Sequence, residues 1–410
     1  MRATTPARTT PAGPNQLSPL ARCVGDVPTF IDHHWSQRPL LRAGADGDAD
    51  AFADLFSIDA VDTLISSLPR LPEFRLVRDG TPVDPSRYCV TRTVGGKPVP
   101  GVGDPARIHA ELASGATIVM QSLQRTWPPL ARFCRLLELE LTHPVQANAY
   151  VTPPGERGLG VHHDTHDVFV LHLAGRKRWQ VYEPVVDHPL SDQRWSAGTA
   201  PTPMILDTEL RPGDCLYMPR GFPHAAWSQD ETAAHLTIGL LAFSTQDVLA
   251  ELLRRTHDAI AFRRSLRPGF ASDAGFVADV DEIVTRLGQW LATLDTAVVA
   301  EAVSERFWAT RPPVLPGQLG QLARLDGVHE ASVVRRRETA VCRLSVRDDM
   351  LVAVLGPRRL EMPAALESVV RRLVAGPAVC LADLDDDIDE KSRTVLARRL
   401  IREGVIELVG

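Results

Sequence analysis

The chain has 410 residues, and its 45 Lys and Arg against 51 Asp and Glu give a formal net charge of −6. This length predicts two or three domains that each bury a core, and a hydrophobic content of 44% excludes a wholly disordered chain. The mildly acidic balance argues against bulk nucleic-acid binding, and no run approaches the ~18 apolar residues of a membrane span.

Residues 1–20 are rich in Pro and Thr and lack an apolar h-region, so we expect a disordered leader rather than a secretory signal. The six cysteines are widely spaced, with no CxxC pair. This pattern fits reduced thiols in a cytoplasmic protein better than a disulfide framework or a zinc ribbon.

The first third of the chain has a mixed pattern. Apolar residues at helical spacing predict helices over 50–68 and 105–113, with a short strand over 74–77 between them. A strand is expected over 116–120, and a helix over 128–141 has Pro in its first turn.

Short β-rich runs dominate residues 145–243, separated by turns that contain Gly and Pro, which indicates a β-sandwich or barrel. The expected strands are 145–152, 168–173, 178–182, 215–218 and 235–241. Helical patterns return over 247–257 and in a long amphipathic stretch over 276–308, before a break at Pro312 and Pro313.

The remaining residues alternate short strands with helices in an order that resembles a winged-helix module. The expected strands are 342–346, 351–355 and 405–409, and the expected helices are 363–374 and 389–403. Six acids and no base lie within 383–390. Because such a run repels phosphates, we expect a structural or protein-docking module and no direct DNA binding.

Two segments, 160–172 and 212–224, carry the chemistry. On an extended backbone, residues i and i+2 face the same side, so His162 and Asp164 face one side together. A turn, a short strand and a Pro-rich loop would present His224. Two imidazoles and one carboxylate form the facial triad that is typical of non-haem Fe(II) oxygenases.

An HxD motif on a β-rich run, followed by the sequence PGDCLYMPRGFPH, resembles the JmjC-type cupin oxygenases, and within them the ribosomal oxygenase family of protein hydroxylases. The resemblance implies an α+β fold with a double-stranded β-helix (cupin/JmjC) core, and metal ligation by His162, Asp164 and His224. It also implies a catalytic domain over 21–244 with an N-terminal α/β extension. A helical dimerisation region over 245–312 and a winged-helix-like domain over 313–410 would follow.

The family binds 2-oxoglutarate with a basic residue just past a hairpin turn and an upstream tyrosine. Lys177 and Tyr150 stand at these positions, and Asn148 shares the strand face of Tyr150, so that it could also donate to the cosubstrate. A buried dicarboxylate needs a paired cation. A register slip of one would give that role to Arg176 or Arg178, which would face the opposite side.

Four other histidines lie near the triad. His163 should point away from Asp164, whereas His166 shares the parity of the triad and competes as a ligand unless the chain bends before it. We expect His172 and His235 to line the barrel; the family more often carries Gln at the position of His172. In the loop 153–160, Glu156 is either a receptor for a cationic substrate or a solvated carboxylate.

The resemblance implies an enzyme that binds Fe(II) and uses 2-oxoglutarate and O2 as cosubstrates. Its expected substrate is an arginyl or histidyl side chain of a ribosomal protein, and the expected assembly is a homodimer without membrane association. One alternative keeps the chemistry but acts on a peptide or small molecule of specialised metabolism. Another is a ligand-sensing cupin and winged-helix regulator that binds DNA. A cupin without 2-oxoglutarate is disfavoured by Lys177 together with Tyr150.

Overall fold

The structure is a computed structural model that describes residues 17–44, 50–196, 199, 202–384 and 388–409. Most of the expected leader, residues 1–16, lies outside the described residues. Helix α1 (Pro19–Val24) already begins inside the range expected for the leader, because the Ser18 hydroxyl caps it by accepting a hydrogen bond from the Ala21 N–H at 3.2 Å.

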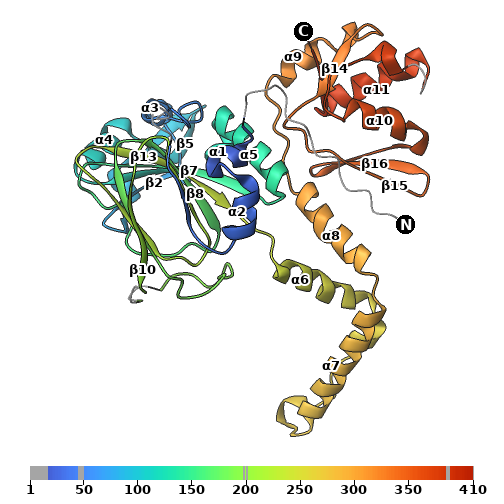
Figure 1. Cartoon of the computed structure of the whole chain (residues 1–410), viewed down its shortest axis with the longest axis horizontal. Helices are drawn as coiled ribbons and strands as arrows, with labels where there is room; N and C mark the ends of the chain where they lie inside the picture. Colours follow the sequence, from blue (N-terminus) through green and yellow to red (C-terminus); the bar gives the residue numbers. More distant parts are fainter. Residues whose placement is uncertain (1–16, 45–49, 197–198, 200–201, 385–387, 410) are drawn as a thin grey trace.

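The first body is built on two β-sheets (Figure 1). The larger sheet has the order β1-β11-β8-β13-β7-β6-β2-β3, and the smaller has the order β10-β9-β12. The large sheet comprises β1 (Leu40–Arg42), β2 (Phe74–Arg78), β3 (Thr81–Pro82), β6 (Thr117–Met120), β7 (Val145–Thr152), β8 (Asp167–Ala174), β11 (Cys215–Met218) and β13 (Ala233–Leu240). The small sheet comprises β9 (Lys177–Tyr182), β10 (Met204–Leu210) and β12 (His224–Ser228).

The two sheets share one apolar cluster, to which both contribute buried side chains. Its members are Val168, Val170, Trp179, Val181, Leu210, Leu216, Met218 and Phe222. The β-barrel or sandwich predicted for residues 145–243 is therefore present. Strands β10 and β12 were not anticipated, since β10 is largely exposed and β12 begins at a residue that the sequence places in a loop.

Helices α1, α2 (Val27–His33) and α5 (Pro128–Leu141) pack against the large sheet and share its larger apolar core. Helix α4 (Pro105–Ala113) and the hairpin of β4 (Cys89–Val94) and β5 (Lys97–Gly103) complete the body. The helix expected over 50–68 is shorter than predicted. It forms α3 (Ile58–Ser66), because Ser57 caps its N-terminus by accepting from the Ala60 N–H.

The expected long helical stretch is divided into α7 (Phe276–Thr293) and α8 (Thr296–Ala309), preceded by α6 (Thr245–Arg255). The division arises because the Asp295 carboxylate caps the Ala297 N–H at 2.9 Å, which starts a new helix. Figure 1 shows these helices as an arm between the two bodies, with α7 standing apart from both. None of the α7 residues is buried.

The C-terminal body has its own apolar core and two three-stranded sheets, β18-β14-β19 and β15-β16-β17. Its strands are β14 (Val333–Arg336), β15 (Arg343–Arg347), β16 (Met350–Leu355), β17 (Arg358–Pro363), β18 (Val379–Cys380) and β19 (Ile406–Leu408). Its helices are α9 (Gln318–Ala323), α10 (Glu367–Leu373) and α11 (Glu390–Arg402). All strands and helices expected here have counterparts, shifted by a few residues at their ends. Residues 385–387 of the acidic run lie outside the described residues.

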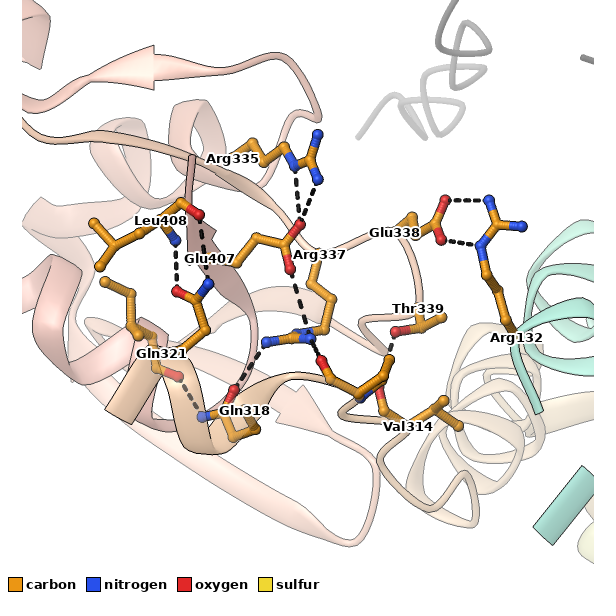
Figure 2. A network of polar contacts seen from close by, with 12 residues as sticks. Arg132, Val314, Gln318, Gln321, Arg335, Arg337, Glu338, Thr339, Glu407 and Leu408 are labelled. Atoms are coloured by element: carbon orange, nitrogen blue, oxygen red, sulfur yellow. Dashed lines mark hydrogen bonds and ion pairs between the residues drawn. The ribbon is translucent and has the colours of Figure 1, made fainter. Parts of the chain in front are cut away.

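A polar network secures the segment that enters this body (Figure 2). The buried Arg337 guanidinium donates to the Pro316 carbonyl at 2.6 Å and to Gln318 Oε1 at 2.9 Å. The Thr339 hydroxyl donates to the Val314 carbonyl at 2.8 Å. These bonds fix the entering chain against the sheet that holds β14 and β19.

Two further contacts join the bodies. Arg132 of α5 forms an ion pair with Glu338, also drawn in Figure 2. Glu138 of α5 is nearly buried between Arg135 and Arg311, and its Oε1 lies 2.5 Å from Arg311 and accepts from the Val145 N–H at 3.0 Å. A buried carboxylate between two guanidiniums anchors the linker to the first body.

Candidate metal centre and adjoining cavity

His162, Asp164 and His224 form a compact cluster, in which one ligand atom of each lies within 4.8 Å of the others. His224 Nε2 is 3.8 Å from Asp164 Oδ2. The structure thus brings together the three residues predicted to hold a metal. In the part of the chain that the structure describes, no other group of His, Cys, Asp and Glu meets this criterion.

Backbone carbonyls orient both imidazoles. His162 Nδ1 lies 2.8 Å from the Gly160 carbonyl oxygen, and His224 Nδ1 lies 3.0 Å from that of Phe222. Each Nδ1 therefore carries the proton and donates, which leaves a lone pair on Nε2. This is the arrangement that a metal-ligating histidine requires. The donor set of the cluster consequently fits a divalent transition metal.

Backbone pairing holds these ligands together. His162 and His224 form an antiparallel bridge, with the His224 N–H donating at 2.8 Å and the His162 N–H at 3.2 Å. The HxD motif thus precedes β8, and its backbone pairs with the start of β12. The Asp164 carbonyl accepts from the Gly221 N–H at 3.0 Å, which ties the motif to the Pro-rich loop.

A fully buried carboxylate supports the same loop. Asp167 Oδ2 accepts from the Tyr217 hydroxyl at 2.7 Å, and its Oδ1 accepts from the Arg220 N–H at 3.0 Å. The loop that ends at His224 is therefore pinned to the first residue of β8.

Electrostatics favour the ligating forms of the cluster. Burial, together with the neighbouring His162, lowers the pKa of His224 to about 4, so that this imidazole is neutral at physiological pH. Burial alone would raise the pKa of Asp164, but the surrounding imidazoles, His224 foremost, outweigh it and lower the pKa. A neutral imidazole and a carboxylate are the states that bind metal.

A cavity of about 540 Å³, including its opening to solvent, adjoins the cluster and reaches between the two sheets. All three members of the cluster line it, and so do Lys177 and Tyr150. The remaining lining residues are Thr117, Gly158, Leu159, Val168, Val170, Trp179, Met218, Ala225, Ala226, His235 and Thr237.

Lys177 is a buried cation without a counter-ion. Its side chain is 3% exposed, and Nζ donates to the Thr152 hydroxyl at 2.9 Å. Burial lowers the pKa of Lys177 to about 7. No carboxylate among the described residues pairs with this ammonium, so the cavity offers one unsatisfied positive charge to an anion.

Tyr150 lies on β7, the strand that also carries Thr152, and its ring stacks on that of His235 with centroids 5.0 Å apart and planes 3° apart. Burial raises the pKa of its hydroxyl to about 12, so the group remains a neutral donor. Asn148 shares this face of β7 but does not line the cavity. Its Oδ1 accepts from the Ser122 N–H at 2.9 Å, which engages the carbonyl half of the amide.

The other histidines have separate partners. His163 faces away from the cluster, with Nε2 3.0 Å from the Gln193 carbonyl oxygen and an edge contact to Trp195. His166 follows a bend and lies outside the ligand cluster, with Nε2 3.4 Å from Gln146. His172 is buried on β8, and its Nε2 lies 2.9 Å from the Gly175 carbonyl oxygen.

Two alternatives from the sequence find little support. Arg178 faces the opposite side of β9, as expected, and pairs with Asp207 at 2.7 Å. Arg176 lies near three acidic groups on the surface. The carboxylate of Glu156 packs against Gly115 and does not line the cavity.

The sequence analysis missed Thr152 and Trp179. Thr152 follows Tyr150 by two residues and Trp179 follows Lys177 by two, so strand parity alone could have placed both on the cavity face.

Among the described residues, none of the helices combines the length and the apolar character of a membrane span.

Residues 120–248 match the model of the JmjC domain family. The chain is 30% identical to ribosomal oxygenase 1 of Bos taurus over 292 residues, which cover 65% of this chain and 42% of that protein. It is 28% identical over 214 residues to the bifunctional lysine-specific demethylase and histidyl-hydroxylase NO66 of Drosophila persimilis, covering 51% of this chain and 29% of that one. It therefore spans less than half of the length of these relatives.

Among solved structures, it is similar to YcfD, a ribosomal oxygenase from Escherichia coli in complex with cobalt and 2-oxoglutarate. The TM-score is 0.52 at 18% identity, and the match covers 93% of this chain and 98% of that one. This likeness extends the fold comparison across the arm and the C-terminal body. The match over residues 120–248, the cluster of His162, Asp164 and His224 and these relatives together show that the chain contains a JmjC domain similar to that of the ribosomal oxygenases.

Proposed function

We propose that the chain is an Fe(II)- and 2-oxoglutarate-dependent oxygenase that hydroxylates a protein side chain. The observation that carries the proposal is the metal-ligand cluster and the unpaired Lys177 ammonium in one cavity. One ligand would satisfy both features, with its 2-oxo acid group at the metal and its distal carboxylate at Lys177. The cobalt- and 2-oxoglutarate-bound relative supports this choice of ligand.

In this proposal His162, Asp164 and His224 hold Fe(II), and Lys177 and Tyr150 hold the distal carboxylate of 2-oxoglutarate. Asn148 would contribute only through its NH2 group, because its oxygen is engaged. Iron, O2 and 2-oxoglutarate supply the oxidising chemistry when bound. The chain's own residues orient the dicarboxylate and keep water out of a cavity that is largely apolar between β8 and β9.

The proposed substrate is an arginyl or histidyl residue of a ribosomal protein. The names of the relatives support a ribosomal target, and one of them is called a histidyl-hydroxylase. The alternative of a DNA-binding regulator is less well supported, since a complete ligand cluster and an unpaired cation in one cavity are the parts of an enzyme site. We further propose a cytoplasmic location, which the six free thiols support.

We also propose domains over 21–244, 245–312 and 313–410, with the last as a winged-helix-like protein-docking module and the middle as a homodimerisation region. One stripe of α7 supports the dimer. Val277, Val280, Val284, Leu287 and Leu291 recur at alternating intervals of three and four residues, as in a coiled-coil seam. Val277 is 69% exposed and Val284 61%. An apolar stripe this exposed needs a partner, for which a second copy of the helix is the simplest candidate.

The substrate proposal predicts a specific product. Ribosomal proteins from cells that contain this protein should include one that is heavier by a single oxygen atom than in cells lacking it. Fragment mass spectrometry should place the oxygen on an arginyl or histidyl residue. A chain with Asp164→Ala is the control, since it keeps the fold but loses a ligand, and it should restore the lighter mass. Identical masses in all three strains would contradict a ribosomal substrate.

The metal proposal predicts that His162→Ala and His224→Ala abolish Fe(II) or Mn(II) binding while the fold persists, because each removes one of three protein ligands. His166→Ala is the control and should keep metal binding, since His166 lies outside the cluster. Calorimetric metal titration with circular dichroism measures both properties. Metal loss in His166→Ala together with retention in His162→Ala would overturn the ligand assignment.

The lowered pKa of Lys177 predicts pH-dependent cosubstrate binding. With a pKa of about 7, the Lys177 amine of the ligand-free protein is mostly charged below pH 7 and increasingly neutral above it. A bound carboxylate raises this pKa, so binding above pH 7 takes up a proton and the affinity falls roughly tenfold per pH unit. Calorimetry with Mn(II)-loaded protein measures the slope. Lys177→Arg should flatten it, and Lys177→Met should weaken 2-oxoglutarate by about 3–5 kcal/mol. A flat profile in the wild type would refute the lysine assignment.

The dimer proposal predicts that Val280→Glu or Val284→Glu produces folded monomers, because a carboxylate in an apolar seam would be buried without a partner. Gln289→Glu, on the opposite face of α7, is the matched control and should remain dimeric. Sedimentation velocity measures the change. A monomeric wild type, or dimers in all variants, would show that this stripe is not the seam.

A further inference from the structure

His235 is a nearly buried imidazole that the proposed chemistry does not use. It lines the cavity from β13, is 4% exposed, and stands opposite Tyr150 and His172 in the sheet register. Its ring stacks on Tyr150 and meets the edge of Trp179, with centroids 5.4 Å apart and planes at 84°. The ring is therefore held in one orientation by two aromatic neighbours.

The hydrogen bonding of this ring is incomplete. His235 Nδ1 is buried without a hydrogen-bond partner. By contrast, His162, His172 and His224 each direct one ring nitrogen at a backbone carbonyl. Burial, with Lys177 next in effect, lowers the pKa of His235 well below its usual range, so the ring is neutral and carries one N–H. With the proton on Nε2, the ring can donate a hydrogen bond to a ligand in the cavity. Nδ1 then carries no hydrogen, so no N–H group is buried without an acceptor.

His235 lies on the part of the cavity wall that also holds Lys177. It is not a member of the ligand cluster, and it contacts Trp179, whose ring lies 5.9 Å from that of His224. Lys177 Nζ donates to the Thr152 hydroxyl, and Thr152 pairs in register with Ala233, which lies two residues before His235 on the same face of β13. An anion that reaches Lys177 would therefore also lie beside His235.

We infer that His235 donates its ring N–H to the distal carboxylate of the bound cosubstrate, as a donor additional to Lys177, and thereby selects 2-oxo dicarboxylates over 2-oxo monocarboxylates. The inference rests on the proposed function, because it concerns the ligand of that same cavity. Lys177 forms an ion pair with one carboxylate oxygen. The imidazole of His235, held by its aromatic neighbours, fixes the orientation of the carboxylate.

The test compares two ligands in Mn(II)-loaded protein by calorimetry. 2-Oxovalerate has the carbon chain of 2-oxoglutarate, with a methyl group in place of the distal carboxylate. His235→Phe keeps a flat ring between Tyr150 and Trp179 but removes the N–H. It should weaken 2-oxoglutarate about 10- to 100-fold, the effect of one hydrogen bond to a charged group, and leave 2-oxovalerate unchanged. His235→Gln, which retains an N–H donor, should recover part of the loss.

His143→Phe is the matched control. His143 is another stacked imidazole, with its ring 5.4 Å from that of Trp35, but it does not line the cavity. This variant should bind both ligands as the wild type does. His235→Met, which also lacks an N–H, replaces His235→Phe should that variant fail to fold.

Two results would overturn the inference while the proposed function stands: wild-type affinity for 2-oxoglutarate in His235→Phe, or equal losses for both ligands, which would indicate a packing role. Failure of the wild type to bind 2-oxoglutarate at all would remove both the inference and the proposed function.

Discussion

The site depends on one short stretch of backbone pairing, the antiparallel bridge between His162 and His224. Two hydrogen bonds, of 2.8 and 3.2 Å, join residues that are separated by 62 positions in the chain. Because the bridge places the two imidazoles side by side, their nitrogens converge with the Asp164 carboxylate. The Gly221 N–H donates to the Asp164 carbonyl and ties the Pro-rich loop to the HxD segment, and the Asp167 carboxylate, which accepts from the Arg220 N–H, ties the same loop to β8.

The second feature that defines the site is a charge placed where the protein provides no counter-charge. Lys177 is surrounded by Thr152, apolar strands and neutral imidazoles, and its pKa falls because burial penalises the ammonium. A structure that only needed stability would pair such a group or replace it with an apolar one. An unpaired cation in the same cavity as a metal-ligand cluster instead complements a dianion with two separated carboxylates. Lys177 and the cluster together, and neither alone, therefore favour 2-oxoglutarate as the ligand.

The arm and the C-terminal body are connected to this site through α5. Glu138 forms ion pairs with Arg135 and with Arg311, which lies at the start of the linker. Arg132 pairs with Glu338 of the C-terminal body. The linker is thus anchored on the helix that packs behind the large sheet. Helix α7 has no buried residue, and Val277, Val280, Val284 and Leu291 of its apolar stripe are exposed.

The sequence by itself predicted the three residues of the ligand cluster and most of the elements around it. Strand parity and turn residues are local properties, so they placed β7, β11, α4 and α5 correctly, whereas the assignment of Lys177 and Tyr150 came from the family resemblance. Local patterns failed where a cap decided the outcome, as at Ser57 and Asp295, because the apolar periodicity continues through both positions. Parity also tells which side a residue faces but not what lies opposite it. Only the tertiary structure therefore decided that Asn148 turns its oxygen to Ser122, that the HxD segment pairs with β12 ahead of β8, and that His235 stands clamped beside the lysine with a nitrogen unpaired.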